Sequence, residues 1–331
     1  MNPKVSVCIP YSMDWPHIYF TANQAATLLV ASKLSHEIIV VANNSDEQCI
    51  EDTAKLITAR DFGEPHRAKL IVNDTPSNGV AANIAAQHAT GEYLCFMDSH
   101  CVLHPNIFEE CIKVMEADDL AGLVHAPITW TGVPHNPENF DFVPGKRCYQ
   151  YRYREWDNKK PGEWYLHQHF HGTYNHAMQN PRPYQIAGCG HGFFMVRRST
   201  WEKVGGYHPG QIAYGGREPF VTFKMWLFGF RNYTVPTTNH IHYNGRRMYH
   251  WTQDWWYENC MMQAYSTAGE KYLDIIYDKF VAKKGNAKEK LMSMRESAVE
   301  KSKSQRAFVL ANQQYEFEDL FKLWDDKKVY Y

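Results

Sequence analysis

The sequence predicts an α/β domain in which helices flank a mixed, mostly parallel sheet, followed by a helical C-terminal extension. Short β-rich apolar runs alternate with segments of helical periodicity over residues 1–130. The last part of the chain, by contrast, is charged and amphipathic. Such alternation builds parallel strands joined by helical crossovers that cover both faces of the sheet.

The predicted elements follow one another as strand, helix, strand. β-rich or buried runs predict strands at residues 4–10, 37–43, 68–74, 93–98 and 122–127. Apolar residues at helical spacing predict helices at residues 21–34, 46–59, 79–89 and 106–117. Asn78 and Gly79 are expected to start the third helix. In such sheets ligands bind beyond the carboxyl ends of the strands, so residues that follow a strand are the first site candidates.

Composition excludes several classes of protein. The 331 residues carry 35 Lys and Arg against 36 Asp and Glu, so no global basic field indicates nucleic acid or an anionic membrane as partner. No basic segment followed by a long apolar stretch opens the chain, and no long uncharged apolar window occurs in it. We therefore expect a soluble, cytoplasmic protein without signal peptide or membrane anchor. The 8 cysteines form no C-x-x-C pair and are expected to be reduced core residues.

Two polar residues, Asp98 and His100, stand where the predicted strand at residues 93–98 ends. A buried strand seldom ends on a carboxylate and an imidazole for packing reasons alone, although a polar loop is the plain alternative for His100. The first strand is followed by YSMDWPH and not by G-x-G-x-x-G, and no P-loop motif occurs, which disfavours a dinucleotide oxidoreductase. A divalent cation held by Asp98 is another way to bind a diphosphate.

Five stretches resemble, in this order, the successive motifs of glycosyltransferase family 2. They are VSVCIPY, EIIVVANNSDE, SNGVAANIAAQHATGEYLCFMDSH, AGCGHGFFMVRRSTWEKVGGY and YGGREPFVTFKMWLFG. The resemblance covers about residues 4–250 and implies a Rossmann-like GT-A fold that uses a nucleotide-sugar donor. The D-x-H form of the usual D-x-D, together with YGGRE, is more similar to the polypeptide N-acetylgalactosaminyltransferases.

This resemblance implies that Asp98 and His100 bind a divalent metal against the donor diphosphate, with a later histidine as third ligand. The segment TTNHIHYNGRR offers His240 and His242. The family's G-H-V-F-R segment aligns best with IHYNGR, which favours His242. Mixed oxygen and imidazole ligands with phosphate favour Mn²⁺ over Mg²⁺.

The resemblance also places the donor base across the ends of the first two strands. Pro10 and Tyr11 are expected to shape this pocket, and Asn83 is expected near the donor. The family has an acid near the end of the second strand that contacts uracil, but here Ala42 and Asn43 stand there. Asparagine both donates and accepts, so uracil, cytosine and guanine stay open, with a UDP-sugar as the first expectation.

Gly188, Gly190 and His191 are expected to line the sugar pocket, because missing side chains let a sugar approach the backbone. A tight turn is the plain alternative for this glycine-rich stretch.

Glu218 stands at the position of the carboxylate that deprotonates the acceptor hydroxyl in inverting members of the family. We expect it on a loop that faces the sugar pocket. The polypeptide N-acetylgalactosaminyltransferases are retaining, however, and have Glu then Asn where this chain has Arg217 then Glu218. Retention therefore stays open. In its plain alternative, Glu218 pairs with Arg217 or caps a helix that begins at Pro219.

Two other segments invite functional interpretations. Residues 136–185 are long and irregular, as binding loops or lids are. Within them His167, His169 and His171 alternate, which indicates one face of a strand more than a second metal site. Arg246, next to several tyrosines and tryptophans, is expected to neutralise the diphosphate, while the aromatic rings either stack on a ligand or pack in the core.

The chain is divided at residue 253. We expect a transferase domain at 1–253, with a nucleotide-binding half at 1–130 and a sugar and acceptor half at 131–253, and a helical extension at 254–331 with a break at Gly285 and Asn286. The extension is expected to pack on the domain or on a second subunit as a homo-oligomer.

A metal-dependent transferase competes with a catalytically inactive sugar-nucleotide or glycan binder and with a nucleotidyltransferase. Asp98, His100 and Glu218 together argue against the inactive binder. The acceptor stays open among a glycan, a protein, a small molecule and a modified nucleic-acid base, the last because of the Arg and Trp cluster around Arg246.

Overall fold

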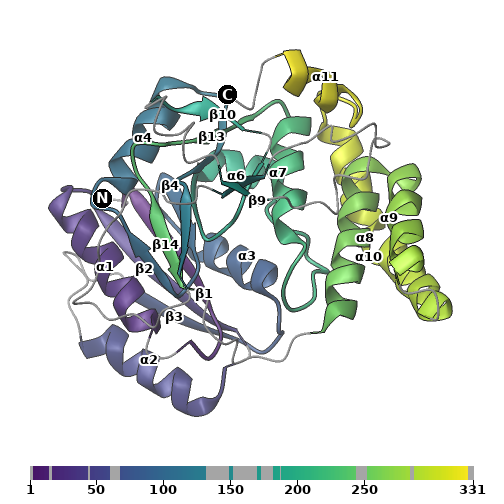
Figure 1. Ribbon diagram of the computed structural model, residues 1–331. Coiled ribbons are helices and arrows are strands. Elements are labelled where there is room, and N and C mark those ends of the chain that lie inside the picture. Colours follow the sequence, from purple (N-terminus) through teal and green to yellow (C-terminus); the bar gives the residue numbers. More distant parts are fainter. Residues whose placement is uncertain are drawn as a thin grey trace.

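The structure is a computed structural model, and it describes residues 3–14, 17–43, 45–59, 68–131, 149–151, 170–172, 182–186, 188–243, 252–283 and 287–326. Figure 1 shows a central sheet with helices on both sides, and the helices α8, α9 and α10 grouped beside it.

The central sheet has eight strands in the order β10-β13-β6-β12-β4-β1-β2-β3. Their bounds are β1 (Val5–Tyr11), β2 (His36–Asn43), β3 (Ala68–Asn73), β4 (Tyr93–Met97), β6 (Ala121–His125), β10 (Tyr184–Gln185), β12 (Phe193–Arg197) and β13 (Arg231–Thr234). The pairs β1–β2, β1–β4, β2–β3 and β6–β13 are parallel. Strand β12 runs antiparallel between β4 and β6, and β10 runs antiparallel to β13. The predicted mixed, mostly parallel sheet is therefore confirmed.

Helices cover both faces of this sheet, because alternate strand side chains are apolar on both sides. They are α1 (His17–Ala31), α2 (Glu47–Ala59), α3 (Asn78–His88), α4 (Ile107–Ala117), α6 (Arg198–Val204) and α7 (Arg217–Leu227). Val7 and Cys95 face the core under α1 and α4, while Cys8 and Leu94 face the core under α3 and α7. The start of α3 is as predicted, with Ser77 as its N-cap. The predicted helix at 21–34 begins earlier, at His17.

The other strands that the structure describes form two small sheets. The first has the order β5-β14-β7, from β5 (Cys101–Leu103), β14 (His240–Tyr243) and β7 (Ile128–Thr131). The second has the order β11-β8-β9, from β11 (Gly188–Cys189), β8 (Tyr149–Tyr151) and β9 (Phe170–Gly172). The first of these sheets matters for the site, because it joins the chain after β4 to a segment more than 130 residues later.

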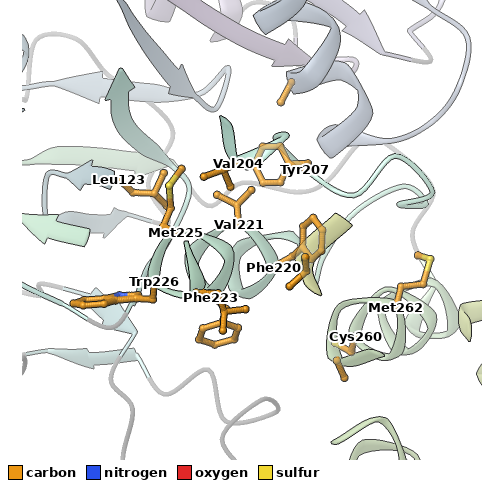
Figure 2. Close-up of a cluster of buried hydrophobic side chains, with 14 of the residues drawn as sticks. Leu123, Val204, Tyr207, Phe220, Val221, Phe223, Met225, Trp226, Cys260 and Met262 are labelled. Carbon is orange, nitrogen blue, oxygen red and sulfur yellow. The ribbon is translucent and has the colours of Figure 1, made fainter. Parts of the chain in front are cut away.

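The C-terminal helices complete one of the two cores. They are α8 (Gln253–Ala268), α9 (Glu270–Lys283), α10 (Lys288–Asn312) and α11 (Asp319–Asp326). Cys260 and Met262 of α8 lie in one hydrophobic cluster with Phe220 and Val221 of α7, as Figure 2 shows. Of the two expected arrangements, the structure therefore has these helices packed on the α/β part of the same chain. The expected break at Gly285 and Asn286 lies outside the described residues, between α9 and α10.

The loop that leads into α7 is fastened to α8 by Asn259. Its side chain is 1% exposed and makes hydrogen bonds with the Ile212 N–H over 3.0 Å, the Ile212 carbonyl over 2.7 Å and the Gly215 carbonyl over 3.0 Å. In addition, His208 Nε2 lies 3.0 Å from the hydroxyl of Ser302 on α10. The C-terminal helices therefore hold the loop that precedes α7.

Replacing Asn259 by alanine is expected to lower the melting temperature clearly. Each backbone group left buried and unpaired costs about 1–3 kcal/mol, and each kcal/mol corresponds to roughly 2–4 °C in a domain of this size. Asn312 is the matched control, because its amide also donates to a carbonyl, that of Phe308, but at the exposed end of α10. Thermal unfolding of Asn259→Ala and Asn312→Ala measures the difference; equal shifts would contradict the anchoring role.

All the cysteines that the structure describes are free thiols, and all of them except Cys49 are buried. This agrees with the expected reduced state; Cys148 lies outside the described residues. Within the described part of the chain, no helix combines the length and the apolar character needed to cross a membrane.

Candidate active site

Asp98 lies where the central strand β4 ends, at the carboxyl edge of the sheet. Its backbone N–H donates to the Gly192 carbonyl over 3.0 Å. This contact exists because β12 is antiparallel to β4, with Phe193 opposite Met97, so that the start of β12 lies beside the end of β4. Two distant segments therefore meet at the edge where α/β sheets bind ligands.

His242 reaches Asp98 and His100 through the first small sheet. Strand β14 pairs with β5 so that His242 lies opposite Cys101. His242 Nε2 lies 3.1 Å from Asp98 Oδ2 and 3.1 Å from His100 Nε2. One candidate ligand atom from each of the three side chains lies within 4.8 Å of the others. The structure thus brings together the three residues predicted as metal ligands.

His240, the alternative third ligand, lies elsewhere in the core. Its ring is fully buried. The centroid of this ring lies 5.8 Å from the ring centroid of His125 and 5.7 Å from that of Phe193. Burial, assisted by the neighbouring histidines, lowers the pKa of His240 well below its usual value. A neutral histidine packed among rings is typical of a core residue, so the geometry favours His242.

Gly192 permits this close approach, and the sequence analysis did not assign it a role. A Cβ at Gly192 would stand 2.8 Å from His240 Nε2 and 3.2 Å from His242 Cδ2. A side chain here would therefore push β12 away from β14. The signal was present in the sequence, since Gly192 is the third glycine of AGCGHG.

A buried ion pair holds the other oxygen of the Asp98 carboxylate. Arg217 Nη2 donates to Asp98 Oδ1 over 2.9 Å, and the Arg217 side chain is 4% exposed. Burial disfavours the charged carboxylate, but the charge of Arg217 and the hydrogen bond with His242 hold the pKa of Asp98 well below its usual range. Arg217 therefore belongs with Asp98, His100 and His242. The sequence analysis considered it only as a partner of Glu218.

The three side chains fit a divalent cation. A carboxylate oxygen and two imidazole nitrogens suit borderline transition metals, with phosphate oxygens to complete the shell. Ligand atoms about 2.1 Å from one ion and at right angles to each other are about 3 Å apart. The two measured separations of 3.1 Å match that spacing.

The residues predicted to shape the base pocket lie at the ends of the first two strands. Pro10 and Tyr11 end β1, and Asn43 ends β2 with 4% of its surface exposed. Asn43 Oδ1 accepts hydrogen bonds from Asn73 Nδ2 over 2.9 Å and from the Ser77 N–H over 3.2 Å. The oxygen of Asn43 is therefore already used within the protein, and its amide hydrogens are what it could offer a base.

Asn83 fastens α3 to the loop before α7. Its oxygen accepts from the Tyr207 N–H over 2.9 Å, and its amide donates to the Tyr207 carbonyl over 2.9 Å. Both polar atoms of the Asn83 amide therefore bond the protein backbone, and the expected donor contact stays a prediction.

The residues predicted to line the sugar pocket differ in their surroundings. A Cβ at Gly188 would stand 2.6 Å from Thr222 Cγ2, so this glycine lets β11 pack against α7. Among the residues that the structure describes, nothing lies within 4 Å of the corresponding point at Gly190. His191 is 3% exposed, and its Nδ1 lies 2.6 Å from the Tyr207 hydroxyl. Gly190 is thus the position where the backbone can be approached.

Glu218 lies in the first turn of α7, so the expected loop position is wrong. The helix begins at Arg217 and not at Pro219, with Gly216 as its N-cap. Gly215 and Gly216 have φ values of 93° and 71°, a left-handed backbone that favours glycine. The glycine pair of YGGRE therefore makes the sharp entry into α7.

The surroundings of Glu218 place it near the sugar-pocket segment. Glu218 is half-buried. Burial of the Cys189 and Cys260 thiols is the main cause of their raised pKa, and the negative charge of Glu218 raises it further. Thr222, one turn later on α7, is the residue that touches Gly188. Glu218 therefore lies near β11 and α8, on the helix that packs against the glycine-rich strand.

Several predicted residues cannot be placed. Arg246, His167 and His169 lie outside the described residues. His171 is in β9, where its backbone pairs with that of Gln150 in β8.

Asp14 is a neighbour of this cluster that the sequence analysis missed. Its Oδ2 lies 3.1 Å from His100 Nδ1 and also accepts a hydrogen bond from the Ser99 hydroxyl. A signal was available, because Asp14 follows β1 in YSMDWPH, at the same edge of the sheet.

Comparison with known proteins agrees with this fold. The model of the family "Glycosyl transferase family 2" matches residues 6–205. N-acetylgalactosaminyltransferase 7 of Drosophila melanogaster is 24% identical over 235 residues, which covers 69% of this chain and 37% of that protein. The chain therefore spans less than two fifths of the length of this curated relative.

Solved structures show the same architecture. The crystal structure of GalNAc-T7 with UDP, GalNAc and Mn²⁺ has a TM-score of 0.59 at 19% identity, over 90% of this chain and 54% of that chain. The mannosyltransferase PcManGT from Pyrobaculum calidifontis, in complex with GDP-Man and Mn²⁺, has a TM-score of 0.52 at 14% identity, over 98% of this chain and 88% of that chain. The predicted GT-A fold is therefore confirmed. Since the family model also matches more than half of its residues, the chain belongs to glycosyl transferase family 2.

Proposed function

We propose that this chain transfers a sugar from a nucleotide-sugar to an acceptor hydroxyl, with a divalent ion held by Asp98, His100 and His242. The observation that carries the proposal is the convergence of these side chains at the carboxyl edge of the sheet in a family 2 domain. Mn²⁺ is the proposed ion, with Mg²⁺ second, because two of the ligands are imidazoles. Such an ion neutralises charge on a departing diphosphate.

Within this proposal Glu218 is the general base of an inverting transfer. It accepts the proton of the acceptor hydroxyl while that oxygen bonds to the anomeric carbon and the bond to the diphosphate breaks. Its place beside β11 supports this role, since α7 packs against the glycine-rich strand there. Retention is the alternative, and it would leave Glu218 without the role of base.

A UDP-sugar is the proposed donor. The UDP in the GalNAc-T7 structure supports uridine, whereas the similar PcManGT structure contains GDP-Man. Asn43 does not discriminate strongly, because uracil, cytosine and guanine all have carbonyl oxygens that accept an amide hydrogen. Arg246 is proposed to contact the diphosphate.

The proposed acceptor is a hydroxyl on a glycan, a protein, a small molecule or a modified nucleic-acid base. An inactive protein that only binds sugar nucleotides is disfavoured, because binding alone needs no general base, whereas Glu218 matches the family's general base in the motif resemblance. Association through the C-terminal helices is a further proposal, which sedimentation of the full chain would test.

Metal removal tests the proposal directly. We expect the protein with Mn²⁺ to release UDP slowly from a UDP-sugar, and to stop in EDTA, because the leaving diphosphate then loses its counter-charge. Chromatography of the nucleotides released from UDP-, GDP- and CMP-sugars measures this, and added Mn²⁺ should restore the rate. Full activity in EDTA would exclude the metal role, while tight donor binding without turnover on any acceptor would favour the inactive binder.

A further inference from the structure

Asp14 stands behind His100 rather than among the three candidate ligands. It follows the central strand β1, and its side chain is 21% exposed. Its Oδ2 lies 3.1 Å from His100 Nδ1, on the opposite side of that ring from Nε2, which faces His242 at 3.1 Å. The Ser99 hydroxyl donates to the same carboxylate oxygen.

The backbone around Asp14 is held in an unfavourable conformation. Met13 has a φ of 50°, the left-handed region that residues other than glycine seldom adopt. The Met13 N–H donates to the Ser45 hydroxyl over 3.4 Å, and the Asp14 carbonyl accepts from the Ile18 N–H over 3.2 Å. Strain of this kind persists only where the surroundings enforce it, and it is frequent at functional sites. Here it accompanies the turn that carries Asp14 to His100.

The contact decides which nitrogen of His100 is free to bind an ion. A carboxylate accepts a hydrogen bond, so the proton of a neutral His100 lies on Nδ1 and the lone pair is on Nε2. Nε2 is the atom that faces His242 Nε2, at 3.1 Å. The opposite tautomer would put a proton where the ligand atom has to be.

The charge of Asp14 also matters. The carboxylate of Asp98 already pairs with the Arg217 guanidinium at 2.9 Å, so its charge is largely compensated before any ion arrives. The other two candidate ligands are imidazoles, which bind metals as neutral groups. Asp14 adds a second negative charge next to the cluster.

We propose that Asp14 is a positioning residue that holds His100 in the Nδ1-protonated tautomer and raises the affinity of the cluster for divalent cations. The proposal rests on the proposed metal-dependent function. Carboxylates behind a histidine ligand are typically worth 10–100-fold in metal affinity, which sets the size of the expected effect.

The test is a titration of the full metal-free chain with Mn²⁺. The electron paramagnetic resonance signal of unbound Mn²⁺ is measured after each addition. We expect Asp14→Ala to weaken Mn²⁺ binding about 10–100-fold and Asp14→Asn to weaken it less, because asparagine keeps an oxygen that accepts from Nδ1 but lacks the charge. Asp46→Asn is the matched control and should bind like the parent. Asp46 also follows a strand of the sheet and precedes a helix, but it is exposed and accepts from the Cys49 N–H over 2.7 Å.

A second readout separates positioning from a general loss of stability. Long-range ¹H–¹⁵N spectra report the tautomer of each histidine, and the signals missing in His100→Ala identify His100 among the 17 histidines. We expect the Nδ1–H form in the metal-free parent protein and its loss in Asp14→Ala, with melting temperatures in EDTA as the folding control. Should Asp14→Ala fail to fold, the isosteric Asp14→Asn variant carries the test through its reduced affinity.

The outcomes are distinguishable. If the parent protein does not bind Mn²⁺, or if His100→Ala binds it equally well, the metal site of the proposed function is wrong and the inference is wrong with it. If His100→Ala weakens binding while both Asp14 variants bind like the parent protein, only the role of Asp14 is overturned.

Discussion

Asp98→Asn is expected to reduce sugar transfer by about 10³-fold or more, because the several kcal/mol that a metal ion supplies to a leaving diphosphate would be lost. Mn²⁺ affinity should fall together with the rate. Asparagine is preferable to alanine here, since its oxygen can still accept the hydrogen bond from Arg217. Alanine would leave the Arg217 charge buried without a partner, at a cost of about 3–5 kcal/mol.

The matched control for this variant is Asp118→Asn. Asp118 also pairs with an arginine, Arg231 at 3.2 Å, and accepts from the Tyr233 hydroxyl over 2.7 Å. It precedes β6, however, whereas Asp98 follows β4, and these two strands run in the same direction. Asp118 therefore lies at the amino ends of the strands and Asp98 at their carboxyl ends. Initial rates and Mn²⁺ titrations of both variants are compared, and transfer by Asp98→Asn at the rate of Asp118→Asn would contradict the metal role of Asp98.

Glu218→Gln is expected to lower turnover by about 10²–10⁴-fold, the usual contribution of a general base, and to leave the donor dissociation constant almost unchanged. If Glu218 only stabilised the start of α7, the substitution would cost about 0.3–1 kcal/mol of stability and little turnover. Glu47→Gln is the matched control, because Glu47 is an exposed acid in the first turn of α2. Steady-state kinetics and thermal unfolding of both variants separate the two roles.

The stereochemistry of the product provides an independent check of Glu218. A base that activates the acceptor for one direct displacement gives a product with inverted anomeric configuration, which NMR of the product measures. Retention of configuration would remove Glu218 from this role even if the glutamine variant were inactive.

Arg217 changes the chemistry of the YGGRE segment in this chain. The resemblance to the polypeptide N-acetylgalactosaminyltransferases implies Glu at this position, whereas here a buried guanidinium binds the Asp98 carboxylate. It keeps Asp98 ionised and directs Oδ2 toward His242. Arg217 therefore couples α7, which also carries Glu218, to the candidate metal cluster.

The sequence by itself determined the strands β1, β2, β3, β4 and β6 of the central sheet and the helices α1 to α4. Short β-rich or buried apolar runs predicted the strands at 4–10, 37–43 and 93–98, which the structure has at Val5–Tyr11, His36–Asn43 and Tyr93–Met97. Such a run is a property of neighbouring residues, so it can be read locally. The motif order was similarly sufficient to choose His242, which lies beside Asp98 and His100 as expected.

Only the tertiary structure decided which polar groups meet across long stretches of chain. Asp14 and His100 are 86 residues apart, and Arg217 and Asp98 are 119 apart. No periodicity predicts such pairs, because the first depends on β1 pairing in parallel with β4 and the second on the loop before α7 folding back to the sheet edge. For the same reason the sequence did not show that Asn83 bonds the Tyr207 backbone, since a polar side chain on a helix bonds whichever segment the fold brings to it.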